Sequence, residues 1–500
     1  FPTRRSSDLR INPMSLEGEK RNNLIMIAAD QLRSDVLGMG VTPNLEQLMG
    51  ESVIFERAYC ACPLCVPARG ALFTGTYPGR NGSLINGWFG PEKEYSRVGA
   101  AFDNLYDMME RLDMECIHSG KQHYFTEGEP LECRAASKTK WLTTEKTYKE
   151  FLREEGKRQP GGKRFRTPVP EMHAGKYTRV SNYSNASTGI YEEGNAYYFD
   201  GYFTDRAVEA LREVKGDRPL FLSMMHLAPH PPFDIPEPWY SKVSQSDFEL
   251  PENTGVWYPH QSPVQKYNLT GVIGNQYSVE EWKESFRVYL GLVALLDDCV
   301  GRIIGVLNEK GLYDSSMIIF TSDHGEMMGA HCLFQKMCMY EESARVPFLV
   351  KLPESSNGGR HIEQSVSHID VLPTICDYNS ISPRHLMDGC SLRQLLEDGT
   401  DTGDRAVYIQ YDGNASLGNY SRCVIDGNYK LIVDFFKDEI FLEVYDLDRD
   451  RLETDNLVFY EKYDEVAERL IGILAEHMRE INDSLVLPAM DLKEFRERYQ

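Results

Sequence analysis

Four short apolar runs that end abruptly in polar residues restrict the fold of this chain more than any other feature. The runs span residues 24–29, 116–118, 219–225 and 317–320. Short segments that are apolar throughout and bounded by polar residues are typical of buried strands. In an open α/β sheet the ligand site lies beyond the carboxyl ends of the strands. We therefore expect one site, assembled at that edge from distant parts of the sequence.

Helical segments are expected between these strands. The longest runs from Glu280 to Leu312, where apolar residues recur at helical spacing and predict a face packed into the core. Strands that alternate with helices predict an α/β sandwich. The segment 125–200 shows no clear periodicity and is interpreted as an elaborated surface insertion, the kind of segment that often shapes a substrate pocket.

The pattern changes near residue 400. Strand-like runs at 406–409, 429–433 and 441–445, followed by a helical stretch from 460 to 481, predict a small antiparallel sheet with a covering helix. For 500 residues, one large domain with a smaller one is the natural expectation. We assign 14–400 to the catalytic domain and 401–500 to a C-terminal α+β subdomain. The first thirteen residues, 1–13, are expected to be a non-native leader before a start at Met14.

Composition excludes several classes of partner. Lys and Arg number 54 against 76 Asp and Glu, and the net charge of −22 should repel nucleic acid and anionic membranes. No segment approaches the roughly 20 apolar residues that cross a bilayer. The eleven cysteines are scattered and odd in number, which favours buried free thiols over a disulfide framework. A cytoplasmic enzyme without nucleic-acid or membrane partners is expected.

The segment from Cys60 to Gly75 carries a candidate nucleophile. Pro67 suits a first helical turn, which places Cys65 at the positive helix N-terminus, where an anion or a thiolate is favoured. Arg69, one turn later, can reach the same anion. Taken alone, Cys62 and Cys65 also fit a CxxC redox pair. A redox pair does not require the Pro, Arg and Thr-Gly that follow, and a zinc site lacks a second ligand pair.

Two of the four runs lead into candidate metal ligands. Asp30 and Gln31 follow the first run, and Asp323 and His324 follow the last. Any one of them alone could equally cap a strand end or a turn. Two carboxylates and an amide oxygen together form an oxygen-rich set that suits Ca²⁺ or Mg²⁺ better than zinc.

The cysteine segment resembles the signature of the sulfatase family, the formylglycine-dependent (type I) branch of the alkaline phosphatase-like superfamily. That signature is Cys-x-Pro-Ser/Ala-Arg followed by a Leu-Thr-Gly element. The matching residues are Cys65, Pro67, Ala68, Arg69, Leu72, Thr74 and Gly75. The resemblance implies a large mixed central sheet sandwiched by helices, with a smaller domain of antiparallel sheet plus helix. It also implies that a formylglycine-generating (sulfatase-maturing) enzyme oxidises Cys65 to formylglycine. One hydroxyl of the hydrated aldehyde then attacks sulfur, and the other expels sulfate.

The same resemblance implies roles for the other candidates. The metal ligands would be Asp30, Gln31, residue 65, Asp323 and His324, with Ca²⁺ favoured over Mg²⁺. Arg69 and Lys121 would hold the formylglycine, His123 would assist its proton transfer, and His230 with Lys336 would grip sulfate or protonate the leaving oxygen. His331 would be a substrate contact. Gln31 departs from relatives with a second Asp there, and Ala330 and Cys332 depart from a Gly-Asp-His-Gly pattern.

The expected function is therefore hydrolysis of a sulfate monoester. The ester would be carried by a small molecule or an oligosaccharide, most simply a sulfated carbohydrate. Relatives with the same groups act on phosphorus, which makes a phosphonate monoester or phosphodiester hydrolase the alternative. A protein in which Cys65 stays a thiol, either non-catalytic or redox-active, is the alternative of another class.

Overall fold

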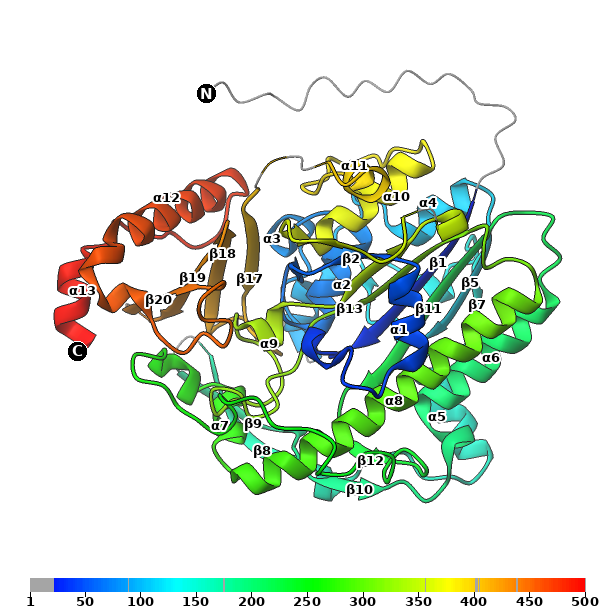
Figure 1. Cartoon of the computed structure of the whole chain (residues 1–500), viewed down its shortest axis with the longest axis horizontal. Coiled ribbons are helices and arrows are strands. Elements are labelled where there is room, and N and C mark those ends of the chain that lie inside the picture. The colour runs from blue at the N-terminus through cyan, green and yellow to red at the C-terminus, as the bar shows by residue number, and fades with distance from the viewer. Residues whose placement is uncertain are drawn as a thin grey trace.

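An eight-stranded mixed sheet forms the centre of the protein, with the strand order β15-β2-β14-β13-β1-β11-β5-β7 (Figure 1). The computed structural model describes residues 22–499 except 89, 174–175, 356, 401–402, 404 and 438. The predicted leader 1–13 and the start at Met14 lie outside the described residues. The strands of this sheet are β1 (Asn23–Asp30), β2 (Val53–Phe55), β5 (Glu115–Gly120), β7 (Lys140–Trp141), β11 (Leu220–Pro229), β13 (Ser316–Ser322), β14 (Phe348–Lys351) and β15 (Arg360–Ile362).

The four apolar runs of the sequence become four consecutive strands. β13, β1, β11 and β5 lie side by side and all run parallel, so their carboxyl ends share one edge of the sheet. β14 is antiparallel to both β13 and β2, which makes the sheet mixed as expected. The polar residues that follow the four runs are thereby collected at one edge.

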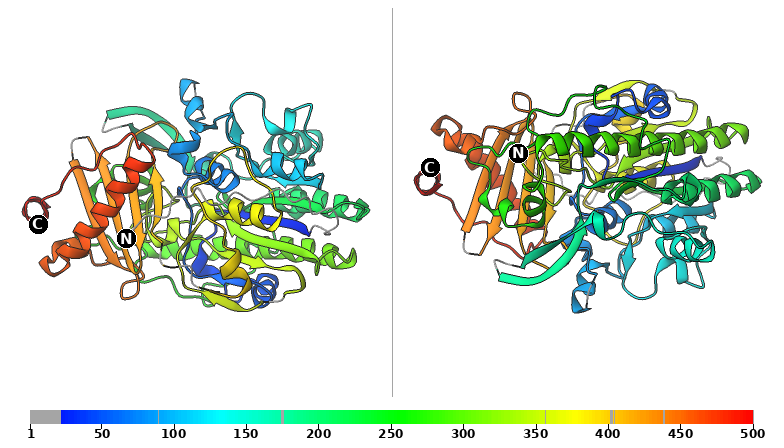
Figure 2. Two further views of the ribbon diagram at one scale, coloured as in Figure 1. Left: turned by 90° about the horizontal axis from the view of Figure 1, so that it is seen from above. Right: turned by 90° about the horizontal axis from the view of Figure 1, so that it is seen from below.

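Both faces of the sheet are buried. Since alternate residues of each strand point to opposite sides, neighbouring residues of one strand belong to different hydrophobic clusters. In β1, Ile25 and Ile27 belong to the hydrophobic cluster beneath α6 and α8. Leu24 and Met26 belong to the opposite cluster, together with residues of α2, α4 and α10. Helices therefore cover both faces, as the views from above and below show (Figure 2).

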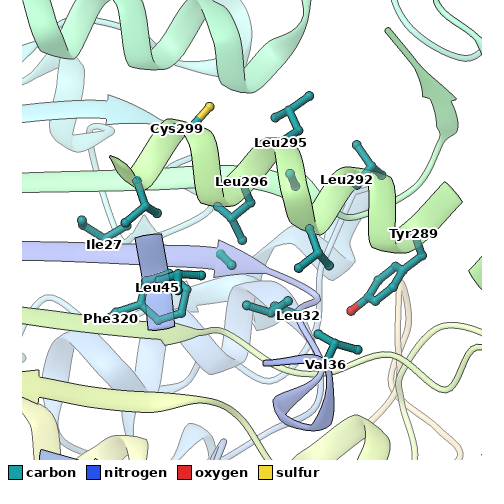
Figure 3. Packing of buried hydrophobic residues seen from close by; sticks show 14 of the residues in the cluster. Ile27, Leu32, Val36, Leu45, Tyr289, Leu292, Leu295, Leu296, Cys299 and Phe320 are labelled. Carbon is teal, nitrogen blue, oxygen red and sulfur yellow. The ribbon is translucent and has the colours of Figure 1, made fainter. Parts of the chain in front are cut away.

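The helices have the following bounds: α1 Pro43–Gly50, α2 Cys65–Thr74, α3 Pro78–Asn81, α4 Leu105–Arg111, α5 Glu145–Glu154, α6 Phe199–Glu213, α7 Leu269–Gly274, α8 Val279–Glu309, α9 Glu341–Ala344, α10 Val371–Tyr378, α11 Arg393–Glu397, α12 Asp464–Glu480 and α13 Leu492–Tyr499. The longest, α8, matches the predicted helix from Glu280 to Leu312 within three residues. A capping box between Ser278 and Glu281 begins it. Its apolar residues belong to the same buried cluster as Ile27 of β1 and Phe320 of β13, and Leu296 points from the helix toward β1 (Figure 3). Among the described residues, no helix is long and apolar enough to span a membrane.

The segment 125–200 contains more regular structure than its weak periodicity suggested. It contributes α5, the edge strand β7 and a hairpin of β8 (Arg166–His173) and β9 (Lys176–Ser184). The other short strands of the main domain are β3 Ala58–Tyr59, β4 Arg97–Val98, β6 Phe125–Thr126, β10 Thr188–Ile190, β12 Phe233–Ile235 and β16 Val366–Ser367.

The C-terminal subdomain is a four-stranded antiparallel sheet, as predicted, with α12 packed on β18 and β19. Its strands are β17 (Val407–Tyr411), β18 (Tyr420–Asp426), β19 (Tyr429–Phe436) and β20 (Glu439–Asp446). The sequence patterns predicted only β17, β19 and β20. Leu431 and Val433 face the core beneath α12, whereas Cys423, Ile425 and Ile432 join the main-domain core. The small sheet is thus packed on both sides.

Candidate active site

Helix α2 presents Cys65 as its first residue, with Pro67 in the first turn. The predicted position of Cys65 at the helix N-terminus is confirmed. The helix ends at Gly75, which adopts a left-handed φ of 66° and donates its N–H to the Ala71 carbonyl at 2.8 Å. This geometry explains the Thr-Gly element of the motif, because glycine adopts that conformation without strain.

Asp30, Cys65, Asp323 and His324 form a buried cluster whose candidate ligand atoms all lie within 4.8 Å of one another. Asp30 ends β1, and Asp323 and His324 follow β13, so the parallel pairing of these strands brings the groups together. Four of the five predicted metal ligands therefore meet at one point.

The donor chemistry of this cluster fits a divalent cation. His324 Nδ1 lies 3.0 Å from the Gly325 carbonyl, and a donated proton there leaves Nε2 as the lone-pair atom, 3.1 Å from Cys65 Sγ. The Asp323 carboxylate is oriented by the backbone N–H groups of Gln31 and His324, at 3.1 and 3.0 Å. Fixed carboxylates and an oriented imidazole are the arrangement that preorganises a metal site.

Gln31, the fifth predicted ligand, lies beside the cluster with a left-handed φ of 70°. Its side-chain carbonyl accepts a hydrogen bond from Lys336 Nζ at 2.5 Å, and its amide group donates to the buried Glu326 carboxylate. Gln31 thus links the metal-type cluster to Lys336. The second carbonyl lone pair remains for a cation.

Two cations predicted to hold the nucleophile are buried against the same carboxylates. Arg69 Nε donates to Asp323 at 3.0 Å, and its NH2 group lies 3.3 Å from Asp30. Lys121, which follows β5, forms an ion pair with Asp30. Burial raises the pKa of the Asp30 carboxyl, but Lys121 and Arg69 outweigh burial and keep that pKa well below its usual range.

His123 lies two residues beyond Lys121 and forms an ion pair with Glu145 of α5, with Nε2 and Oε1 3.1 Å apart. Burial lowers the pKa of His123, and Glu145 more than offsets that effect and raises it. Glu145 comes from the segment 125–200, and no spacing in the sequence connects it with His123. The only local signal in the sequence for a helix that begins at Glu145 was Thr144, which caps α5.

His230 and Lys336 approach the cluster from two further loops. His230 follows β11 and is half-buried, with Nδ1 2.5 Å from the Pro231 carbonyl. Burial, Lys336 and Lys121 lower the pKa of His230 well below its usual value. Lys336 is 3% exposed and donates to Gln31. A neutral imidazole and an ammonium group therefore lie next to the nucleophile.

The unmodified Cys65 thiol differs from its neighbours. Burial raises the pKa values of Cys60 and Cys62. At Cys65, burial and Asp30 act in the same direction, but Lys336, Lys121 and His324 prevail and lower its pKa to about 5. All eleven cysteines are free, so Cys62 and Cys65 do not form a disulfide. The surroundings favour an anionic group at residue 65 alone.

A cavity of about 360 Å³ opens onto the nucleophile. Cys65, Lys121, His123, His230 and Lys336 line it, so five of the six predicted catalytic residues share one space. The remaining lining residues are Asn86, Trp88, Glu145, Lys149, Gln159, Pro160, Arg166, Tyr183, Ser184, Phe199, Leu227, Pro231, Pro232, Gln335 and Asn414. Arg69, the sixth, is not among these lining residues and is paired with Asp30 and Asp323.

His331, the predicted substrate contact, is placed elsewhere. It is fully buried, stacks on Tyr340 with ring centroids 4.0 Å apart, and lies 2.9 Å from the Leu452 carbonyl of the C-terminal subdomain. His331 does not line the cavity within the part of the chain that the structure describes. Its contacts are those of a residue that joins the two domains.

Sequence reasoning missed two supporting residues besides Glu145. Glu326 accepts hydrogen bonds from Gln31 and from the backbone N–H groups of Met328 and Gln335. Its place in the Asp-His-Gly-Glu motif was the available signal. Asn86 Oδ1 accepts from the Val66 N–H at 3.2 Å and so fixes the N-terminus of α2. No local pattern identifies it.

The chain is similar to known proteins in sequence and in fold. The chain is 26% identical over 484 residues to an arylsulfatase of Clostridium perfringens, with 91% of this chain and 94% of the relative covered. The structure superposes on a phosphonate monoester hydrolase of Agrobacterium radiobacter with a TM-score of 0.73 and 23% identity, covering 92% and 95% of the two chains. It also superposes on a protein solved with its substrate D-glucosamine-2-N,6-O-disulfate, with a TM-score of 0.68 and 19% identity, covering 93% and 99%.

The family assignment comes from the sequence match. Residues 329–480 match the family described as N-sulphoglucosamine sulphohydrolase, C-terminal. Residues 22–380 match the sulfatase family itself, over most of the chain and across the whole cluster described above. The chain therefore belongs to the sulfatase family of hydrolases, on an alkaline phosphatase-like fold.

Proposed function

We propose that this enzyme hydrolyses sulfate monoesters of carbohydrates with a formylglycine nucleophile made from Cys65. The observation that carries the proposal is the position of residue 65, at the N-terminus of α2 between a metal-type cluster and the cations of the cavity. A maturing enzyme that oxidises Cys65 is the partner that this proposal requires. The hydrated aldehyde supplies a hydroxyl that attacks sulfur and a second one that expels sulfate.

The chain's own residues orient the nucleophile and neutralise charge. Asp30, Asp323 and His324, with Gln31 beside them, would hold a divalent ion, and an oxygen-rich set favours Ca²⁺. Such an ion supplies charge stabilisation for the sulfuryl oxygens. Lys121 and Arg69 fix the carboxylates, and the N-terminus of α2 favours an anion at residue 65.

The two histidines of the cavity suit proton transfer. His123, held by Glu145, is positioned to exchange a proton with the hydroxyl groups at residue 65. His230 and Lys336 line the same cavity, where they would grip the sulfate group or protonate the leaving ester oxygen.

A carbohydrate ester is favoured by the cavity rather than by the nucleophile. Its volume of about 360 Å³ is in the range of small-molecule sites. Its wall mixes amides and charged groups with the half-exposed Trp88, a combination that suits a polar ring with one apolar face. One structural neighbour has a disulfated glucosamine as its substrate.

The test compares a sulfate ester with phosphorus esters as substrates of enzyme co-expressed with a maturing enzyme. We expect kcat/KM for 4-nitrophenyl sulfate to exceed that for bis(4-nitrophenyl) phosphate and for an aryl phosphonate monoester. In a panel of monosulfated saccharides, kcat/KM should then exceed the value for the aryl sulfate. Cys65→Ala is the matched inactive control. Preference for either phosphorus ester would overturn the sulfatase proposal and favour the alternative chemistry.

A further inference from the structure

Two cations that line the cavity have no role in the chemistry described above. Lys149 lies on α5, one helical turn after Glu145, and Arg166 begins β8. Both are exposed, unlike the buried Lys121 and Lys336. Within the described residues, neither side chain donates a hydrogen bond or forms an ion pair. Among the described residues, Arg166 has no counter-charge, and Lys149 faces only Glu145, whose ion-pair partner is His123.

Two other cationic residues between Lys149 and Arg166 in the sequence are paired with acids. Arg158 pairs with Asp234, and Lys157 pairs with Glu193. Partial burial of the guanidinium lowers the pKa of Arg166 although the side chain stays open to solvent, and among the described residues no acidic group offsets that effect. A guanidinium group placed partly out of water without an anion is a position that a ligand anion stabilises.

The charge of the cavity points the same way. Among the described residues, the cavity is lined by four cations, Lys121, Lys149, Arg166 and Lys336, and by one acid, Glu145, which forms an ion pair with His123. This surplus of positive charge stands out in a chain whose net charge is −22. One sulfate group at residue 65 accounts for Lys121 and Lys336. It leaves Lys149 and Arg166 available for a second anion.

We propose that Lys149 and Arg166 form a second anion subsite, which binds a carboxylate or a second sulfate group carried by the same substrate. The inference rests on the proposed function, because it takes the first sulfate to lie at residue 65. It narrows the substrate class to doubly anionic sulfated saccharides. α5 and the β8–β9 hairpin are then specificity elements of this enzyme.

The probes are matched pairs of non-hydrolysable aryl sulfonates that compete with turnover of 4-nitrophenyl sulfate. Each pair consists of a monosulfonate and the disulfonate of the same ring system, taken on benzene, naphthalene and biphenyl so that the span between the anions varies. Sulfo-carboxylates of the same three rings form a third arm. Competition constants are checked by calorimetric titration of the same compounds.

We expect at least one doubly anionic compound to bind on the order of 10-fold more tightly than its monosulfonate, the gain typical of a pair of partly exposed charged contacts. Lys149→Gln combined with Arg166→Gln should remove this gain and leave the competition constant of inorganic sulfate unchanged. The arm with the larger gain identifies sulfate or carboxylate as the preferred second group.

Lys146→Gln combined with Arg153→Gln is the matched control. Both residues are exposed on α5, neither lines the cavity, and the change in net charge is the same. Two results would overturn the subsite. One is that none of the doubly anionic compounds binds more tightly than its monosulfonate, and the other is that the control variant loses the gain to the same extent. A failure of the sulfatase function itself is seen separately, as absent turnover of 4-nitrophenyl sulfate, and the calorimetric titration still measures the subsite.

Discussion

Gly120, at the carboxyl end of β5, ties the geometry of the sheet to the position of Lys121. Its φ is +114°, and a Cβ atom placed there would lie 1.9 Å from the Met225 carbonyl oxygen of β11. Real Cβ contacts stay above 3.0 Å, so Gly120→Ala requires a shift of about 1 Å between the two strand ends. The same carbonyl accepts the Lys121 N–H at 2.8 Å, so the shift moves the Lys121 backbone as well.

We expect Gly120→Ala to cost about 1 kcal/mol from backbone strain and roughly 1–3 kcal/mol more from the clash. A displacement of about 1 Å at a catalytic residue lowers turnover by on the order of 100-fold. The assays are the urea midpoint and kcat/KM for 4-nitrophenyl sulfate at a temperature where the variant is folded. Gly128→Ala is the control, because φ is +87° there but no atom lies within 4 Å of the added Cβ. Gly128→Ala should lose only the stability that backbone strain costs, and it should keep full activity. Equal effects of the two substitutions would refute the reasoning.

Three further predictions follow from buried charges and from the proposed metal. Lys430→Met leaves Glu453, now 2.8 Å from the ammonium, without its counter-charge, and leaves Glu341, now 3.0 Å away, with Arg345 alone. It should lower the free energy of unfolding by about 3–5 kcal/mol in urea titrations, whereas the same change at the exposed Lys493 should have almost no effect. Burial raises the pKa of Glu443 to about 8 from 4.5, so the folded state holds a proton that the unfolded chain releases, and stability should fall as pH rises from 4.5 to 8. Glu443→Gln should flatten that fall in Tm measured at pH 5 and 8.5, and an unchanged slope would contradict it. Dialysis against a chelator should abolish turnover, and Ca²⁺ should restore it better than Mg²⁺; activity that survives complete metal removal would reject the metal site.

The parts of the fold that the sequence predicted are those in which burial fixes residue type over a whole element. The strand at Leu24 is apolar throughout because it is covered on both faces, and α8 shows a clear stripe because one face is core. The convergence of Asp30 and Asp323 was predictable for a related reason. Both follow buried parallel strands, and such strand ends share an edge of the sheet.

Elements whose buried positions do not form a continuous apolar pattern were not predicted from the sequence. α5 has only Tyr148 and Leu152 buried, too few positions for a visible stripe. β18 contains Arg422, a buried cation paired with Asp412 and Asp483 in three dimensions, which interrupts the apolar pattern of a core strand. Glu145 reaches His123 from a different segment, and pairings of that kind depend on tertiary structure rather than on local spacing.

The decisive measurement is the mass of the peptide that contains Cys65, taken from enzyme that turns over 4-nitrophenyl sulfate. We expect a peptide in which the thiol has been replaced by an aldehyde, with the converted fraction rising in proportion to specific activity across preparations. Full activity in a preparation whose peptide carries only unmodified cysteine would contradict it.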